Sequence, residues 1–252
     1  CDNIGNASGD FSLLTHQKIV RDYMNLYTPY RGLLMYHGLG SGKTATSIAI
    51  AEGMKDAKRI IVMTPASLRA NYIEELKKAG DLFYKKNQFW EWISTDKNPD
   101  VAQTISAVLN LPLEYIRKQR GAWFINVKKE SNYDDLADVD RQTLDKQLDE
   151  MIRSKCTFIN YNGLRAKKLQ ELTSGYTKNL FDNSVVIIDE AHNLISRIVN
   201  KLTKEKDIQE DNRGEKEHLP VNLSTKLYEY LLSAQNARIV LLTGTPVINY
   251  PN

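Results

Sequence analysis

The chain has 252 residues, of which 42% are hydrophobic and 26% charged. This composition is typical of a globular domain with a sizeable core, and a net charge of +3 does not by itself indicate a nucleic-acid partner. No apolar run is long enough to span a membrane and the first residues do not resemble a signal peptide, so no membrane partner is expected. The only cysteines, Cys1 and Cys156, are too few for a disulfide framework or a zinc site, which favours a reducing, intracellular compartment.

Five short apolar runs predict buried strands. They are nearly continuous in branched residues instead of alternating with polar ones, as in parallel strands that are covered on both faces. The runs are Gly32–His37, Arg59–Pro65, Cys156–Tyr161, Ser184–Glu190 and Arg238–Gly244. Amphipathic stretches between them predict helices over Thr44–Met54, Ser67–Ala79 and Ser224–Gln235. This alternation predicts one α/β domain over residues 1–252, with a mostly parallel sheet and helices on both faces.

Two segments interrupt the alternation. Residues 81–154 are longer than a single crossover needs and hold all three tryptophans, Trp90, Trp92 and Trp123. We expect a folded insertion there whose tryptophans form its own core, with base stacking as the alternative. Residues 196–218 are dominated by charge and predict an exposed loop.

Four lysines bracket the end of the helix predicted before the insertion. They are expected to form a solvated face, with contacts to phosphates as the alternative. They are Lys77, Lys78, Lys85 and Lys86.

The segment between the first strand and its helix reads HGLGSGKT, residues 37–44, and has the pattern of a phosphate-binding loop. Glycines let the backbone turn tightly and bring N–H groups against phosphate oxygens, while the following helix directs the positive end of its dipole there. Lys43 is expected to reach the β- and γ-phosphates, and the Thr44 hydroxyl to bind Mg²⁺. The motif opens with His37 where the strict pattern has glycine. The remaining residues expected to hold nucleotide here are Gly38, Gly40, Ser41 and Gly42.

A phosphate loop needs a carboxylate near the metal at the end of a second strand. The run VVIIDEAHN supplies Asp189 and Glu190 directly after four apolar residues. Asp189 is expected to hold Mg²⁺ through its water shell, and Glu190 to act as the general base on the attacking water. With Lys43, these two residues are the predicted catalytic set.

The motifs DEAH and LLTGTP (Leu241–Pro246) together resemble those of superfamily 2 helicases and translocases, whose first lobe is a RecA-like ATPase. Other sequence motifs of the family occur in this chain in the same order. LLTHQ resembles the upstream glutamine motif, in which Gln17 would read the adenine edge. Met63–Leu76 and Phe158–Leu164 resemble motifs that lie along the nucleic-acid track. By this resemblance, the track residues are Pro65, Ser67, Leu68, Asn160 and Tyr161.

The resemblance also implies a coupling role for His192, Thr243 and Thr245, which would sense the γ-phosphate and pass its state to the nucleic-acid side. The alternative for His192 is a core histidine bonded to a backbone carbonyl, and for the threonines a plain strand-end turn. In this family the ATPase site forms between two lobes, and the second supplies arginine fingers. The chain carries none of that lobe's motifs, so we interpret it as the first lobe of a longer protein, poorly active alone.

Within the superfamily, the sequences of these motifs are similar to those of the Swi2/Snf2-like branch and of helicases from nucleocytoplasmic large DNA viruses, including poxvirus-type early-transcription proteins. The resemblance implies ATP and Mg²⁺ as cofactors, and as partners nucleic acid (DNA more than RNA), the second lobe and transcription machinery. A viral protein of this kind would act in the host cytoplasm or be carried in the virion.

Three other functions remain open from the residues alone. A GTPase would need a guanine-reading Asn-Lys-x-Asp motif, and the nearest approach, Asn200–Thr203, lacks the Asp. A small-molecule kinase would need a lid and a substrate pocket but neither DEAH nor TGT. A transcription or packaging subunit would keep the fold as a nucleotide-binding switch or scaffold, without unwinding.

Overall fold

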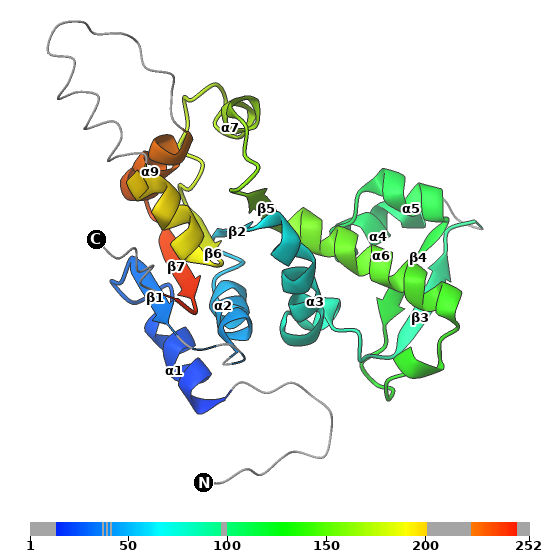
Figure 1. The fold of residues 1–252 in the computed structure, drawn as a ribbon. Helices are drawn as coiled ribbons and strands as arrows, with labels where there is room; N and C mark the ends of the chain where they lie inside the picture. The colour runs from blue at the N-terminus through cyan, green and yellow to red at the C-terminus, as the bar shows by residue number, and fades with distance from the viewer. Residues whose placement is uncertain are drawn as a thin grey trace, which may run out of the picture.

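The computed structural model describes residues 14–36, 38, 40, 42–96, 100–200 and 223–245. Two sheets are present in this part of the chain. The five strands of the main sheet are β1 (Gly32–Tyr36), β2 (Arg59–Thr64), β5 (Cys156–Asn160), β6 (Ser184–Ile188) and β7 (Arg238–Thr243). They are all parallel and lie in the order β1-β7-β6-β2-β5 (Figure 1). All five predicted strands are therefore confirmed, each ending one or two residues before the predicted end.

Helices cover both faces of this sheet, and a smaller unit follows α3 in the chain. The α-helices with defined bounds are α1 (Thr15–Tyr23), α2 (Lys43–Glu52), α3 (Arg69–Ala79), α4 (Val101–Leu109), α5 (Leu113–Gln119), α6 (Asp138–Lys155), α7 (Ala166–Leu172) and α9 (Leu223–Ser233). Short 3₁₀ turns occupy Ala66–Leu68, Leu82–Tyr84 and Tyr133–Asp135. Residues 191–200 are also helical. No helix among the described residues is both long and apolar enough to cross a lipid bilayer.

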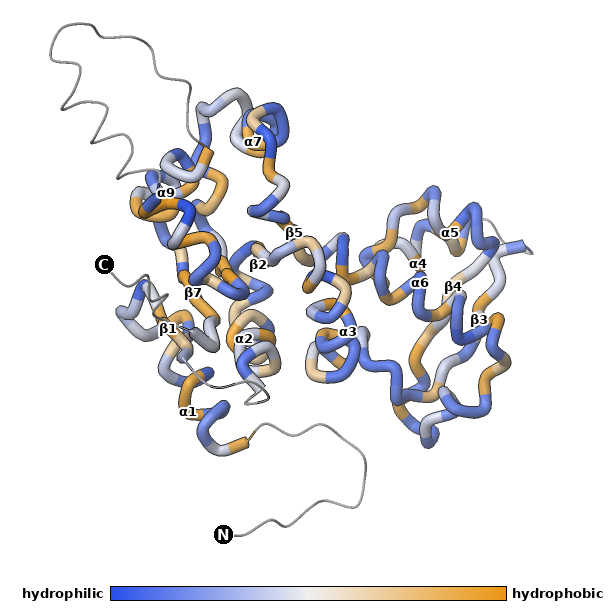
Figure 2. The backbone as a smooth tube through the Cα atoms, viewed as in Figure 1, coloured by the Kyte–Doolittle hydropathy of each residue, from blue (hydrophilic) through white to orange (hydrophobic). Residues whose placement is uncertain are grey.

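The strands divide their side chains between two hydrophobic clusters. On β6, Val185 and Ile187 belong to the cluster that includes α2 and α3, whereas Val186 and Ile188 face the cluster formed with the helix at 191–200 and α9. Successive side chains of a strand point to opposite faces, so a strand that is buried on both faces must be hydrophobic throughout. This explains the unbroken apolar runs of the sequence, and Figure 2 shows the hydrophobic colour along β7.

Residues between α3 and β5 fold around a second sheet. Strands β3 (Trp90–Ser94) and β4 (Gly121–Ile125) pair antiparallel, with α4 and α5 between them in sequence. The long helix α6 returns the chain from this unit to β5 (Figure 1). Trp90 and Trp123 are buried, and Trp123 packs edge-to-face on the half-exposed Trp92 with ring centroids 5.4 Å apart. These tryptophans thus contribute to the unit's own packing.

Ion pairs join this unit to α3. The buried Lys77 ammonium lies 2.9 Å from a Glu74 carboxylate oxygen and 2.7 Å from one of Asp149 on α6. Lys86 lies 3.0 Å from Glu74 and 2.9 Å from Asp145. Lys77 is buried, so the expected solvated face is wrong for this lysine, while contacts to phosphates stay an untested alternative.

The segment 196–218, predicted to be an exposed loop, begins within a helix. Residues 196–200 are the end of a helix, and Ile198 is buried in the core, so the exposed loop predicted from residue 196 does not begin there. The apolar positions of this helix pack on the sheet, a contact that the surrounding charges concealed in the sequence. The remainder of the prediction, residues 201–218, lies outside the described residues.

Candidate nucleotide site

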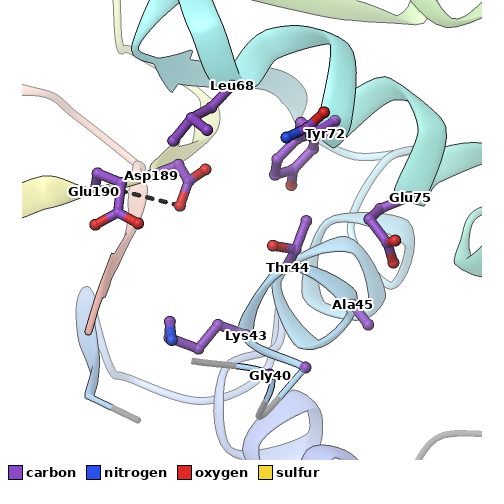
Figure 3. Close-up of a pocket in the computed structure, with 11 residues that line it drawn as sticks. Gly40, Lys43, Thr44, Ala45, Leu68, Tyr72, Glu75, Asp189 and Glu190 are labelled. Atoms are coloured by element: carbon purple, nitrogen blue, oxygen red, sulfur yellow. Dashed lines mark hydrogen bonds between the residues drawn. The ribbon is translucent and has the colours of Figure 1, made fainter. Parts of the chain in front are cut away.

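A cavity of about 400 Å³ lies at the carboxyl ends of the central strands (Figure 3). This is the edge at which parallel α/β sheets bind their ligands. Three elements contribute its walls: the start of α2, one face of α3, and the turn that follows β6. The lining residues are Gly40, Gly42, Lys43, Thr44, Ala45, Leu68, Asn71, Tyr72, Glu75, Asp189 and Glu190.

The phosphate-loop residues reach this cavity through a left-handed backbone. Gly40 and Gly42 have φ angles of +77° and +74°, which glycine adopts without the steric cost of a Cβ. The turn delivers the chain into α2 at Lys43, whose ammonium donates to the carbonyl of Gly38 at 2.9 Å. Lys43 and Thr44 stand at the first turn of a helix, where N–H groups and the helix dipole favour an anion. The predicted contributor Ser41 and the motif's first residue, His37, lie outside the described residues.

Gln17 packs directly against this loop. Its side chain is 3% exposed, its amide nitrogen donates to the Gly42 carbonyl at 3.3 Å, and its amide oxygen accepts from the backbone N–H of Leu14 at 2.9 Å. A Cβ at position 42 would collide with the Gln17 amide nitrogen. The glutamine therefore braces the loop from α1, and the absence of a side chain at Gly42 permits this approach.

The acidic pair follows β6 in a strained turn. The N–H of Asp189 donates to the carbonyl of Met63 at 2.9 Å, which continues the pairing with β2 by one residue. The next N–H, that of Glu190, donates to the Asp189 carboxylate at 3.0 Å, as the dashed line in Figure 3 shows. Glu190 has a φ angle of +47°, a left-handed conformation that costs a non-glycine residue about 1–3 kcal/mol. This conformation lets the chain turn sharply from β6 into the following helix. Asp189 and Glu190 both line the cavity at this turn.

Burial raises the pKa of Asp189 above its usual range, and the adjacent Glu190 charge raises it further. A hydrogen bond from the Glu190 backbone and the charge of Lys43 oppose this rise in the pKa. The ionised Asp189 is therefore held in a place where nearby protein groups do not fully compensate its charge. A bound cation would provide that compensation.

The three predicted coupling residues form a chain of contacts beside the acidic pair. His192 Nδ1 lies 2.9 Å from the Thr243 hydroxyl and 3.3 Å from a Glu190 carboxylate oxygen. The same hydroxyl of Thr243 accepts the backbone N–H of Thr245 at 3.1 Å. Because β7 lies beside β6 in the sheet, the TGT segment meets DEAH directly. His192 contacts side chains here, so the alternative of a histidine bonded only to a backbone carbonyl does not describe it.

The residues predicted for a nucleic-acid track lie at the ends of the neighbouring strands β2 and β5. Ser67 is exposed, Pro65 is buried, and Leu68 lines the cavity. The Asn160 side chain accepts the N–H groups of Asn162 and Gly163 at 3.0 and 3.3 Å, which shapes the turn after β5. Tyr161 is 5% exposed, and its hydroxyl bonds to the backbone of the acidic pair. Tyr161 thus presents no free surface, in contrast to Ser67.

Residues of α3 were missed as part of the site. Asn71, Tyr72 and Glu75 line the cavity opposite the acidic pair, and the Tyr72 hydroxyl lies 3.0 Å from that of Ser47 on α2. The predicted helix over Ser67–Ala79 was the available signal. Its periodicity distinguishes a buried face from an exposed one, but it does not tell which residues border a cavity on another element.

A glycine-rich loop and an acidic pair, at the carboxyl ends of parallel strands in one sheet, define a RecA-like nucleotide-binding domain. The chain belongs to the family described as "Type III restriction enzyme, res subunit", whose model matches residues 14–248.

Curated relatives come from large DNA viruses. The chain is 28% identical over 238 residues to "Putative ATP-dependent RNA helicase R563" of Acanthamoeba polyphaga mimivirus, covering 94% of this chain and 30% of the relative. It is 24% identical over 253 residues to "Putative helicase 087L" of Invertebrate iridescent virus 3, covering 95% and 19%. A "Termination factor NPH-I homolog" of African swine fever virus is 23% identical over 221 residues, covering 88% and 21%. The chain thus spans less than a third of each of these proteins, and the predicted resemblance to helicases of large DNA viruses is confirmed.

Among solved structures, the "Sulfolobus solfataricus SWI2/SNF2 ATPase core in complex with dsDNA" is similar to this chain at 17% sequence identity and a TM-score of 0.44. The similarity covers 96% of this chain and 34% of that one.

Proposed function

We propose that this chain is the first ATPase lobe of a nucleic-acid translocase of the helicase type. The observation that carries the proposal is the cavity itself, where Lys43, Asp189 and Glu190 come from two elements far apart in sequence and line one space. The names of the mimivirus and iridescent virus relatives, which call those proteins helicases, support the class of activity.

The residues around the cavity suit Mg²⁺ and a nucleoside triphosphate. The Thr44 hydroxyl and the Asp189 carboxylate are hard oxygen ligands of the kind that Mg²⁺ prefers, and the negative charge of the adjacent Glu190 favours a cation there. Lys43 and the first N–H groups of α2 are placed to hold phosphate oxygens. When bound, Mg²⁺ supplies charge neutralisation for phosphoryl transfer.

Residues around the cavity have separate roles in the proposed reaction. Glu190 accepts a proton from the attacking water as the general base, and its backbone turn sets the direction of its carboxylate. Gln17 is placed beside the loop, where it would report an adenine base through the contact with Gly42. His192 and Thr243 join Glu190 to β7, so a change at the γ-phosphate would alter the TGT segment. From there the change would pass to the track residues at the ends of β2 and β5.

The partner we propose is nucleic acid, DNA more than RNA, with the second lobe completing the site. We further propose a role in viral transcription, inside infected cells; the African swine fever virus relative, whose printed name calls it a termination factor homolog, supports the transcription part of this proposal. A switch or scaffold subunit that binds nucleotide without turnover is the competing function.

The test is steady-state ATP hydrolysis by the full-length protein with single-stranded DNA, double-stranded DNA or RNA. We expect nucleic acid to stimulate turnover, and Glu190→Gln to lower kcat on the order of 10²–10⁴-fold, because it removes the general base while ATP still binds. Glu171→Gln, an exposed position on α7, is the matched control and should keep wild-type turnover. ATP binding with no hydrolysis under any of these conditions would contradict the motor and favour the switch or scaffold.

A further inference from the structure

The turn after β5 reaches across the sheet to the acidic pair. Strands β5 and β6 are not neighbours, because β2 lies between them. Tyr161 directly follows the end of β5, and its side chain spans the end of β2 to contact the residues that follow β6. This contact joins two strand ends that share no backbone hydrogen bond with each other.

The contact is made to both residues of the acidic pair through their backbone. The Tyr161 hydroxyl donates to the carbonyl of Asp189 at 2.9 Å and to that of Glu190 at 3.1 Å. The Glu190 carbonyl also accepts the N–H of Asn193 at 2.9 Å, inside the first turn of the following helix. With the side chain 5% exposed, water has little access to compete for this hydroxyl. Two successive carbonyls are therefore fixed by one buried donor.

The Asp189–Glu190 turn has a backbone conformation that must be stabilised by its surroundings. Glu190 is in the left-handed region, and such a conformation in a non-glycine residue persists only where its surroundings determine it. On one side the Asp189 N–H is held by the Met63 carbonyl, and on the other the Tyr161 hydroxyl holds the carbonyls. This backbone sets where the Glu190 side chain leaves the turn, and its carboxylate oxygen lies 3.3 Å from His192 Nδ1.

We infer that Tyr161 is a positioning residue for ATP hydrolysis, which holds the Asp189–Glu190 turn so that the Glu190 carboxylate faces the attacking water. The inference rests on the proposed function of the same site. It gives Tyr161 a role behind the wall of the nucleotide site, distinct from the surface contact expected from its motif. The turn on which Tyr161 stands is held in place by the Asn160 side chain and by a bond of 3.4 Å from Arg197 to the Asn162 carbonyl. Arg197 belongs to the helix that follows the acidic pair, so the two segments are joined twice.

The first test is Tyr161→Phe in the full-length protein, which removes only the hydroxyl and keeps the ring. We expect kcat for ATP to fall about 10–100-fold, since a misplacement of about 1 Å at a reacting group costs up to about 10²-fold. The KM for ATP and the calorimetric affinity for a non-hydrolysable ATP analogue should change less than about threefold. Tyr84→Phe, which removes a buried hydroxyl from the other hydrophobic cluster, is the matched control and should keep wild-type kcat.

A kcat within about twofold of wild type would overturn the inference, as would an equal fall in the Tyr84→Phe control. A parallel loss of analogue binding would also overturn it, because it would indicate a structural role.

The second test needs no turnover. In Tyr161→Phe, the amide of Asn193, which bonds to the Glu190 carbonyl, should exchange its hydrogen at least about tenfold faster than in wild type, and faster than in Tyr84→Phe. Unchanged exchange overturns the inference whatever the activity. If the wild-type protein itself hydrolyses no ATP, the proposed function fails, whereas the exchange measurement still decides whether Tyr161 holds the turn.

Discussion

Two clusters of charged side chains, one at the α3–α6 junction and one at the nucleotide end, differ in how far opposite charges compensate one another. Where α3 joins α6, the ammonium groups of Lys77 and Lys86 lie at hydrogen-bonding distances from carboxylates of Glu74, Asp145 and Asp149, so each lysine charge is compensated by protein groups. At the nucleotide end, two carboxylates are adjacent in sequence, and burial, together with the charge of Glu190, raises the pKa of Asp189. The first arrangement stabilises the fold, whereas the second is suited to a ligand that brings positive charge.

Residues with a left-handed backbone also differ between the smaller unit and the nucleotide end. In the smaller unit, Asn110 and Arg120 have φ angles of +52° and +60° and each ends a helix, a common way to terminate α-helices. Glu190 has a similar φ angle but stands between a strand and a helix, at the cavity. The conformation serves chain reversal in one region and the placement of a carboxylate in the other.

The largest effect on stability is expected from removing the central cation of the α3–α6 junction. Lys77→Met should lower the free energy of unfolding by about 2–3 kcal/mol, measured by urea denaturation. This is less than the roughly 3–5 kcal/mol for breaking a fully buried pair, because the carboxylates are partly exposed and Lys86 remains. Lys78→Met is the control, since its pair with Glu75 is exposed and should contribute about 0.5 kcal/mol or less. Equal effects of the two substitutions would show that the junction is not held by this network.

A smaller effect, of opposite sign, is expected at the nucleotide end. Burial raises the pKa of Asp189 in the folded protein, so the free energy of unfolding falls as the pH rises from the unfolded-chain pKa of about 4 to the raised pKa, and the loss is complete above it. Asp189→Asn should therefore raise the thermal midpoint of the nucleotide-free protein near neutral pH. The advantage should shrink as the pH falls through the raised pKa of the folded protein and vanish only below about pH 3, where the carboxyl is protonated in folded and unfolded chains alike.

The variant Asp56→Asn, at an exposed position, reports the effect of losing one surface charge without the cavity. A melting series over pH in which Asp189→Asn is less stable than wild type at neutral pH would contradict this assignment. It would mean that the protein already compensates the carboxylate, and the contrast with the α3–α6 junction would be lost.

Much of the fold could be predicted from the sequence, because parallel strands buried on both faces are continuous apolar runs. The runs that end before Asp189 and at Thr243 gave both the strands and the positions of chemical groups at their carboxyl ends. The phosphate loop was readable because its glycines meet a backbone requirement, seen at Gly40 and Gly42. In these cases the residue type at one position is dictated by local geometry alone.

The contacts between distant segments could not be predicted in the same way. Nothing in the sequence around Tyr161 indicates that its hydroxyl crosses a strand to reach residues 28 and 29 positions later. Likewise Lys77 lies among charged residues typical of a solvated face, and only the return of α6 buries it. A charged or aromatic side chain has the same local pattern whether it meets water or a partner from another element.

The measurement that tests the account most directly is calorimetric titration of this chain with ATP·Mg²⁺ and GTP·Mg²⁺, beside the variant Lys43→Ala. We predict that the wild-type chain binds ATP in preference to GTP, and that the variant loses this binding, because Lys43 stands at the start of α2 on the wall of the cavity. Equal binding by wild type and variant would contradict the central claim that the cavity between α2 and the acidic pair is the nucleotide site.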